Sequence, residues 1–227
     1  MNKKKGISIL SGGLDSVVAT SVYADDYDLT ALTFNYGQKS LEQEIKHAKM
    51  VCENLSIKHE VIDLPWLKSI SNSSLTNDDD IPVVDYEDLD NVLVTSKSAK
   101  SVWVPARNTV FCSIGLAYAE VLDAEIIIVG WDYEEAHTFP DNSKEYLENF
   151  NKTIEYGSFN DVTIKAPLID MNKEDIIEKG FEINAPMELS YSCYAGGKEH
   201  CGTCESCKRR KRGFKKANIK DLTKYTR

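Results

Sequence analysis

The 227-residue sequence lacks the two most familiar glycine-rich motifs of nucleotide-binding proteins. It contains no G-x-x-x-x-G-K-[ST] phosphate loop and no G-x-G-x-x-G dinucleotide fingerprint. It also lacks an apolar run that approaches the length of a membrane span. Lys3, Lys4 and Lys5 lead into an apolar segment of only about six residues, which is too short for a signal peptide. We therefore expect a soluble, cytoplasmic protein without a membrane partner.

The chain contains fewer basic than acidic residues. The chain has 27 Lys and Arg against 36 Asp and Glu, and its net charge of −9 disfavours nucleic acid as a general partner. Many of the acidic residues gather in 78–90, which we interpret as a solvated face. A basic block lies at 208–216. Such a block is typical of a solvated helix face or the flank of a metal site, and less often of a nucleic-acid surface.

Six cysteines are present, and four of them lie close together. Cys193, Cys201, Cys204 and Cys207 form the pattern C-x7-C-x2-C-x2-C. In a cytoplasmic chain such a group indicates a metal site or catalysis before disulfides. Four thiolates in a short segment can complete the tetrahedral shell of one structural Zn²⁺ per chain. An iron–sulfur cluster or a redox pair is the alternative interpretation.

The other two cysteines have a simpler interpretation. Cys52 and Cys112 lie on apolar helix faces, which is typical of buried core thiols. His200 precedes Cys201 and can compete as a metal ligand, but four cysteines already fill the shell.

Strand and helix signals alternate along the chain. Strands are expected at 7–10, 29–35, 57–64, 125–130 and 162–166, and helices at 17–23, 41–55, 105–122, 143–156 and 172–179. Ser143 is expected to be the N-cap of the helix at 143–156, and Gly180 is expected just past a helix end. The alternation predicts an α/β fold with a doubly wound parallel sheet, whose ligands lie beyond the carboxyl ends of the strands.

The expected organisation is a main domain at 1–185 and a small zinc-binding segment with a basic helix at 186–227. Residues 69–100 are polar and Asp-rich and are expected to be irregular. They form either a mobile lid or a surface insertion. We favour a lid, because the segment lies close to Arg107 in the sequence.

The segment Ser11-Gly12-Gly13-Leu14-Asp15-Ser16 follows the first expected strand and opens the first helix. Backbone N–H groups at a helix N-terminus are unpaired, and the helix dipole favours an anion there. The two glycines let a phosphate approach the backbone, and the serines add hydroxyl donors. Asp15 can hold a metal ion that bridges phosphates. Leu10 to Ser16 is therefore predicted to bind the phosphates of a nucleotide.

This loop resembles the S-G-G-x-D-S loop of the PP-loop ATP pyrophosphatases, which cleave ATP between the α- and β-phosphates to adenylate a substrate oxygen. Three further segments occur in order: Phe-Asn-Tyr-Gly-Gln at 34–38, Val-Pro-Ala-Arg-Asn at 104–108, and Ser-Cys-Tyr at 192–194 leading into the remaining cysteines and Arg210. Together they resemble the 7-cyano-7-deazaguanine synthases of queuosine and archaeosine biosynthesis. The resemblance extends from Gly6 to about Phe214.

The resemblance implies a fold like that of the adenine nucleotide α-hydrolases, a homodimer, and a ligase that uses ATP with Mg²⁺, free ammonia and 7-carboxy-7-deazaguanine. The carboxylate is adenylated and ammonia displaces AMP to give an amide. The amide oxygen is adenylated in turn, and its loss leaves the nitrile. Asp15, Ser16, Arg107 and Asn108 are the expected catalytic residues.

Base recognition is expected at the carboxyl edge of the sheet, from Tyr36, Gln38, Asp132 and Glu134. An aromatic ring can stack on a planar base, and a carboxylate can accept its N–H groups. Bacterial members of the resembled family usually carry Tyr-Pro-Asp-Cys-Arg-Pro after the fourth strand. Here only Pro140-Asp141 persists from that segment.

Three alternatives therefore stay open. A sister enzyme can pass the activated carboxylate to another amine. A tRNA-modifying thiolase or ligase would use the basic block at 208–216. A nucleotide-binding module without activity is disfavoured by Asp15, because binding alone does not require a metal-holding carboxylate.

Overall fold

The computed structural model describes residues 3–227 and contains a parallel five-stranded sheet in this range. The order across the sheet is β3-β2-β1-β4-β5. The strands are β1 (Lys4–Ile9), β2 (Tyr27–Asn35), β3 (Lys58–Asp63), β4 (Ile126–Ile128) and β5 (Thr163–Lys165). Every neighbouring pair is parallel, which confirms the predicted α/β fold with a doubly wound sheet. The order reverses between β1 and β4, so the crevice above these two strands is where a ligand is expected.

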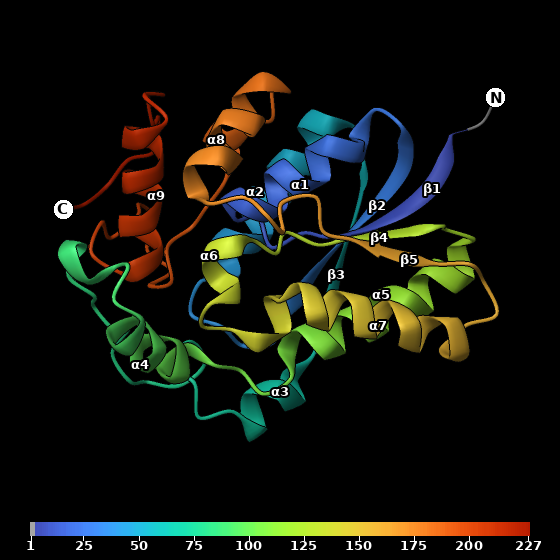
Figure 1. Cartoon of the computed structure of the whole chain (residues 1–227), viewed down its shortest axis with the longest axis horizontal. Helices are drawn as coiled ribbons and strands as arrows, with labels where there is room; N and C mark the ends of the chain where they lie inside the picture. The colour runs from blue at the N-terminus through green and yellow to red at the C-terminus, as the bar shows by residue number, and fades with distance from the viewer. Residues whose placement is uncertain (1–2) are drawn as a thin grey trace.

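Helices cover both faces of the sheet (Figure 1). One face carries α1 (Leu14–Ala24), α2 (Leu41–Leu55) and α8 (Lys173–Glu182), and the other carries α5 (Arg107–Leu122) and α7 (Lys144–Gly157). Strand β4 shows why two layers are needed. Ile127 packs into the core beneath α5 and α7, whereas Ile126 and Ile128 pack into the core beneath α1 and α8. A strand buried on both faces reads as a continuous apolar run, as this one does.

Helix α8 is longer than the sequence predicts. Asn172 caps its first turn in a capping box with Asp175, as the position of the predicted helix start suggests. Gly180, expected just past the helix end, lies inside the helix, which continues to Glu182. A Cβ at Gly180 would lie 2.5 Å from Met187 Sδ and 2.9 Å from Val18 Cγ2. The glycine is therefore there for close packing, and its expected role as a terminator is wrong.

The segment 69–100 contains a helix where the sequence predicts irregular structure. After α3 (Pro65–Ile70) and the short turn η1 (Tyr86–Asp88), helix α4 runs over Val92–Val102. Asn91 caps it by accepting a hydrogen bond from Leu93 N. Its buried face is built from small and polar residues, which give little hydrophobic periodicity: Thr95, Ser98, Ala99 and Val102.

The remaining elements are α6 (Tyr133–Ala136), η2 (Pro140–Asn142), η3 (Met187–Leu189) and α9 (Glu205–Lys216). In Figure 1, α9 and α4 lie at one end of the molecule, beyond α6 and α8. None of the helices in the described residues is both long and apolar enough to cross a membrane.

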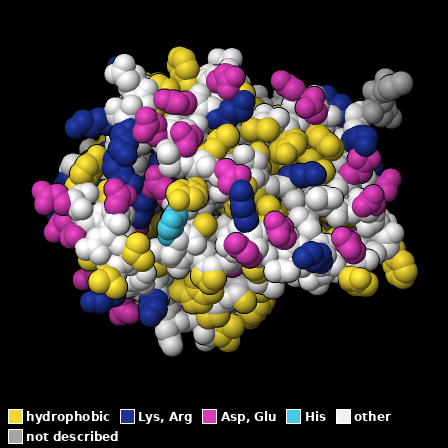
Figure 2. All heavy atoms as spheres, viewed as in Figure 1, with side chains coloured by type: hydrophobic (Ala, Val, Ile, Leu, Met, Phe, Trp, Pro, Cys, Tyr) yellow, Lys and Arg dark blue, Asp and Glu magenta, His cyan; other side chains and the backbone are white. Residues whose placement is uncertain are grey.

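The basic block on α9 is not a free positive face. Arg209 and Arg212 both contact Glu134, with N–O distances of 2.6 and 3.1 Å. Arg210 is 1% exposed and lies 3.3 Å from a carboxylate oxygen of Asp221. Figure 2 shows Lys and Arg side chains interleaved with acidic ones at this end of the molecule. The interpretation of the block as a solvated helix face is therefore wrong for these three arginines.

Candidate functional site

The loop at 11–16 connects β1 to α1 at the carboxyl edge of the sheet. Gly12 has a φ of +78°, and a Cβ there would lie 2.9 Å from Ala48 N and Glu44 O of α2. On the other side, a Cβ on Gly130, just past β4, would lie 2.7 Å from Ser16 N. The loop is thus held tightly between α2 and the end of β4, where only glycine fits at these two positions.

The loop presents backbone donors at the N-terminus of α1. Gly13 is the N-cap residue, and no side chain among the described residues caps this helix end. The Ser11 hydroxyl accepts from Gly13 N at 3.2 Å and lies 3.1 Å from the Ser16 hydroxyl. Ser16 Oγ in turn donates to Gly13 O at 3.0 Å. A pre-shaped loop with free N–H groups and a favourable helix dipole suits a phosphate chain.

A cavity of about 210 Å³ opens above the loop. We call it the main cavity; it lies at the carboxyl ends of β1, β2 and β4. Most of the predicted nucleotide-binding and catalytic residues line it: Leu10, Ser11, Gly13, Leu14, Asp15, Ser16, Arg107 and Asn108. Of the predicted base-reading residues, Tyr36 lines it as well.

Arg107 and Asn108 reach the main cavity from the first turn of α5. The preceding residue, Ala106, has a φ of +51°, a left-handed conformation that non-glycine residues seldom adopt. Arg107 Nη1 donates to the Tyr36 hydroxyl at 3.1 Å, and Asn108 Nδ2 donates to Asp141 O at 3.3 Å. Together they bring one permanent positive charge and an amide to the cavity wall.

Behind the loop lies a buried group of charges centred on Lys173, at the start of α8. Its Nζ lies 2.5 Å from Asp15 Oδ1 and 2.9 Å from Asp132 Oδ2. Burial alone would lower the pKa of Lys173, but the charges of Asp132 and Asp15 outweigh it and raise the pKa well above its usual value. Burial raises the pKa of Asp15, against the opposing effect of Lys173. The ammonium group therefore stays charged and fixes Asp15 beside the loop.

Glu135 completes this group and was missed in the sequence. Its carboxylate lines the main cavity and forms no hydrogen bond or ion pair with the described residues. Burial, followed by the charge of Asp132, raises the pKa of Glu135 to about 8. Carboxylate oxygens of Asp15, Asp132 and Glu135 lie within 4.8 Å of one another, a spacing that a cation can bridge.

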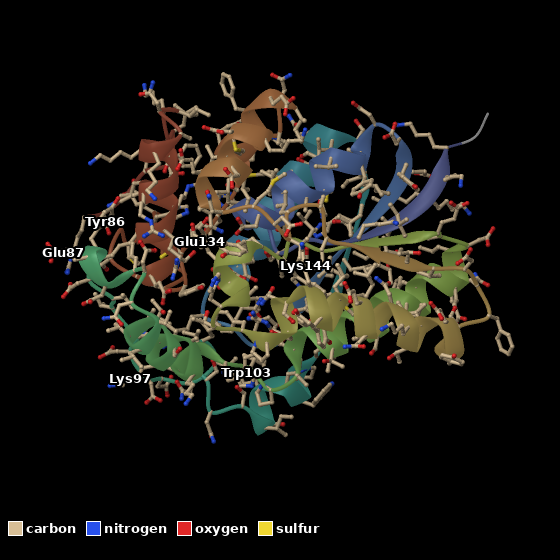
Figure 3. All side chains as sticks on the ribbon, viewed as in Figure 1. Tyr86, Glu87, Lys97, Trp103, Glu134 and Lys144 are labelled. Carbon is tan, nitrogen blue, oxygen red and sulfur yellow. The ribbon has the colours of Figure 1, made fainter. Side chains whose placement is uncertain are left out.

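The other predicted base-reading residues make contacts within the protein. Asp132 is 0% exposed, binds Lys173 and caps α6 by accepting from Glu135 N. Glu134 lies between α6 and α9 (Figure 3), where it accepts from Lys173 N and contacts Arg209 and Arg212. Neither lines the main cavity.

Gln38 is likewise buried and absent from the cavity wall. Its Nε2 donates to Glu44 Oε2 at 2.7 Å, while Ser40 Oγ donates to Glu44 Oε1 at 2.5 Å. Glu44 itself lines the main cavity, and burial raises the pKa of its carboxyl. It is a second acidic residue that the sequence did not single out. Glu44 lies six residues after Gln38, and this spacing matches no known motif.

The four clustered cysteines come together at the start of α9. Their Sγ atoms lie within 4.8 Å of one another, so they can hold one metal ion: Cys193, Cys201, Cys204 and Cys207. Hydrogen bonds from Cys204 and Cys207 lower the pKa of Cys193, which favours a thiolate. The donor set is soft, closed and part-buried, and fits a structural metal.

The cysteine segment also forms part of the main cavity. Tyr191 N donates to Gly12 O at 2.8 Å, so the chain just before the cysteines is bonded to the phosphate loop. Tyr191, Ser192, Cys193 and Tyr194 then line the cavity. The sequence places these residues in a separate segment and gives no sign of this contact.

The two other cysteines and His200 are all buried. Cys52 and Cys112 are buried in the core, and burial raises the pKa of the Cys52 thiol to about 12. His200 lies outside the four-cysteine set. Its Nε2 accepts from Ser192 N at 2.9 Å, and burial lowers its pKa to about 4. His200 therefore supports the cavity wall as a neutral acceptor.

Comparisons with known proteins identify the family of this chain. The family model described as queuosine biosynthesis protein QueC matches residues 5–218. The 7-cyano-7-deazaguanine synthase of Methanosphaera stadtmanae is 70% identical over 98% of this chain and 99% of its own length. That of Methanobrevibacter smithii is 60% identical over 99% of both chains. Among solved structures, the NMN synthetase of Francisella tularensis covers 95% of this chain and 84% of its own, at 19% identity and a TM-score of 0.47. The chain belongs to the QueC family of queuosine biosynthesis proteins.

Proposed function

We propose that this protein converts 7-carboxy-7-deazaguanine and ammonia to 7-cyano-7-deazaguanine, using ATP twice. One observation carries the proposal. The Ser-Gly-Gly-Leu-Asp-Ser loop borders a single cavity with Arg107 and Asn108, in a chain whose close relatives are named 7-cyano-7-deazaguanine synthase. The combination suits adenylation, because it joins a pyrophosphate cradle to a fixed positive charge.

The loop residues have distinct roles in this proposal. Backbone N–H groups at the start of α1 bind the leaving pyrophosphate, and the hydroxyls of Ser11 and Ser16 orient it. Mg²⁺ bound to ATP would supply further charge neutralisation, and Asp15 would hold it through the carboxylate oxygen that does not contact Lys173. Arg107 balances the negative charge that develops on the phosphates during transfer.

Recognition of the base is proposed for the wall that contains Tyr36 and Glu44. Tyr36 offers an aromatic face, and the Glu44 carboxylate can accept N–H groups of the deazaguanine edge. Gln38 and Asp132 would act indirectly. Gln38 orients Glu44, and Asp132 holds Lys173.

We infer that the metal of the four-cysteine site is zinc, because four thiolates form a closed tetrahedral shell for that ion. Its role would be structural, since no open position remains for a substrate. A homodimer stays a prediction that rests on the family resemblance, and a cytoplasmic location stays a prediction from the sequence.

The function is tested by one incubation of the purified protein with ATP, Mg²⁺, ammonium and 7-carboxy-7-deazaguanine. Mass spectrometry is expected to show the amide first and then the nitrile, with two AMP formed per nitrile. A protein that leaves the carboxylate unchanged overturns the proposal. Accumulation of the amide alone limits the activity to the first ligation, and a conjugate formed only with an added amine or tRNA supports the sister-enzyme alternative.

A further inference from the structure

A second, smaller cavity adjoins the main cavity. We call it the small cavity; its volume is about 30 Å³. The two cavities share a set of lining residues, which therefore separate them: Leu14, Asp15, Glu135, Ser192, Tyr194 and Ser206. Glu135 thus faces the site of adenylation on one side and the small cavity on the other.

The size of the small cavity restricts what it can hold. A water-sized molecule needs about 10–15 Å³ of such space, so about 30 Å³ accommodates one or two molecules of that size. A nucleotide or a deazaguanine base is far larger. An ammonium ion, with one heavy atom and nearly the dimensions of water, fits.

The charges around the small cavity leave one carboxylate without a partner. Arg209 is paired with Glu134 and Glu205. Lys173 is paired with Asp15, as described above. The carboxylate of Glu135 has no partner among the described residues. Glu135 is partly buried, and its carboxylate lies close to those of Asp15 and Asp132. Like charges this close repel one another, and a small cation beside Glu135 reduces that repulsion.

A divalent metal is the competing occupant, because Asp15, Asp132 and Glu135 form a group that a cation can bridge. Lys173 Nζ, however, already lies between two of these carboxylates, at 2.5 and 2.9 Å. Asp15 and Asp132 share this ammonium, so Glu135 is the member of the group that no cation contacts among the described residues, and a single carboxylate binds a monovalent ion without displacing Lys173.

We propose that the small cavity is the ammonium subsite of this enzyme, with Glu135 binding the ion at the border of the main cavity. The inference rests on the proposed function, which consumes ammonia. Ammonium gives one proton to the Glu135 carboxylate, and the nitrogen lone pair forms the C–N bond. The C–O bond to AMP breaks, AMP leaves with the electron pair, and the nitrogen loses its second proton to water.

The first test compares Glu135→Gln with wild type in ammonium titrations at fixed pH, with ATP and 7-carboxy-7-deazaguanine saturating. The variant is expected to raise KM for ammonium about tenfold or more, since an ion pair is replaced by a neutral contact. KM for ATP is expected to stay unchanged. Glu87→Gln is the matched control, because this exposed glutamate lies at the outer edge of the molecule (Figure 3).

The second measurement separates the subsite from the function itself. Adenylation without ammonium is followed by the carboxylate-dependent exchange of labelled pyrophosphate into ATP. If wild type shows no exchange, the proposed function fails. If wild type exchanges and Glu135→Gln leaves KM for ammonium unchanged, the subsite fails. A raised Mg²⁺ requirement with an unchanged ammonium KM identifies a metal ligand instead and also overturns the subsite.

A second variant guards against misfolding of the first. Thr138 lines the small cavity but not the main one, so Thr138→Leu is expected to fill the small cavity alone. It should raise KM for ammonium and keep the pyrophosphate exchange. A wild-type ammonium KM in this variant would contradict the subsite independently of Glu135.

Discussion

At the scale of single residues, the carboxylates near the phosphate loop differ in how their charge is balanced. Asp15 and Asp132 share the Lys173 ammonium, Glu134 is held by two arginines, and Glu135 has no partner among the described residues. Their roles follow from these contacts. Two contact the same ammonium, one ties elements together, and one has no cation in contact among the described residues.

Asp15→Asn is expected to abolish pyrophosphate release while leaving the fold intact. The loop is otherwise rich in donors, so its carboxylate is the group that can hold a metal on the phosphates. The fold should persist, because Lys173 retains its pair with the buried Asp132. Pyrophosphate release and the far-ultraviolet circular dichroism spectrum are measured beside exposed Asp26→Asn as control. Release at the wild-type rate would refute this role.

Glu135→Gln is expected to stabilise the protein more at alkaline than at acidic pH. The pKa of Glu135 is raised to about 8 from its ordinary 4.5 by burial and by Asp132. Between these values the folded state holds more protons than the unfolded state, so the free energy of unfolding falls as pH rises. The variant removes this loss, which is on the order of a few kcal/mol. Tm measured at about pH 5 and about pH 8.5 tests it, and an equal gain at both would contradict it.

At the scale of elements, alanine substitution of two helical glycines is expected to change stability in different ways. Gly180→Ala is expected to destabilise the protein by about 1–3 kcal/mol, because its Cβ would overlap Met187 and Val18. Gly157→Ala is the matched control. A Cβ there meets nothing within 4 Å, so the change should be neutral or stabilise by up to about 1 kcal/mol. Urea unfolding measures the free energy of unfolding of both variants. Equal losses of stability would rule out a packing role for Gly180.

Cys201→Ser is expected to remove the metal and lower Tm by about 10 °C, because binding energy at a closed site is also folding energy. Metal content and Tm are measured together. Cys52→Ser serves as the control, since this thiol lies in a separate core cluster and its variant should keep one zinc per chain. A metal-free Cys201→Ser protein of unchanged Tm would contradict a structural metal. A brown wild-type protein would indicate an iron–sulfur cluster.

A structural feature could be predicted from the sequence when it depends on residues that are close together in the chain. The strands, the Ser143 cap and the phosphate loop depend on neighbouring residues, and all of them could be located. Helix α4 gives little signal because its buried face is small and polar. The packing role of Gly180 gives none, because its partners Met187 and Val18 lie outside helix α8.

The site was predicted in part for the same reason. The loop residues, Arg107 and Asn108 fall within short motifs and line the main cavity. Lys173 joins Asp15 across 158 positions of sequence, so no spacing could reveal the pair. The position of Asp132 just past β4 predicts a base-reading role. In the structure Asp132 is instead fully buried and pairs with Lys173.

At the scale of the whole molecule, α9 joins parts that are far apart in the sequence. Arg209 donates to Leu89 O at 3.0 Å, and Arg212 lies 2.8 Å from Asp90, so both hold the segment at 69–100. The same two arginines bind Glu134 of α6. The expected lid is therefore fastened to α9 in this structure, and its opening would require these contacts to break.

Glu134→Ala is expected to cost about 1–3 kcal/mol and to expose the segment at 69–100 to proteases, because two part-buried guanidinium groups lose their shared partner while each keeps one other carboxylate. Tm and limited proteolysis with mapping of the cleavage sites measure this. Glu182→Ala removes an exposed pair with Lys179 and should cost less than about 0.5 kcal/mol. Similar effects of the two variants would show that Glu134 does not join α6 to α9.

The hydrogen bond from Tyr191 N to Gly12 O has a consequence for the newly made chain. The phosphate loop leaves the ribosome well before the wall formed by Tyr191, Ser192, Cys193 and Tyr194. Domains generally fold from the N-terminus during synthesis, so the sheet can form well before this wall is present. A growing chain would therefore carry an open, incomplete nucleotide site, and catalytic competence would arrive only with the cysteine segment and its metal.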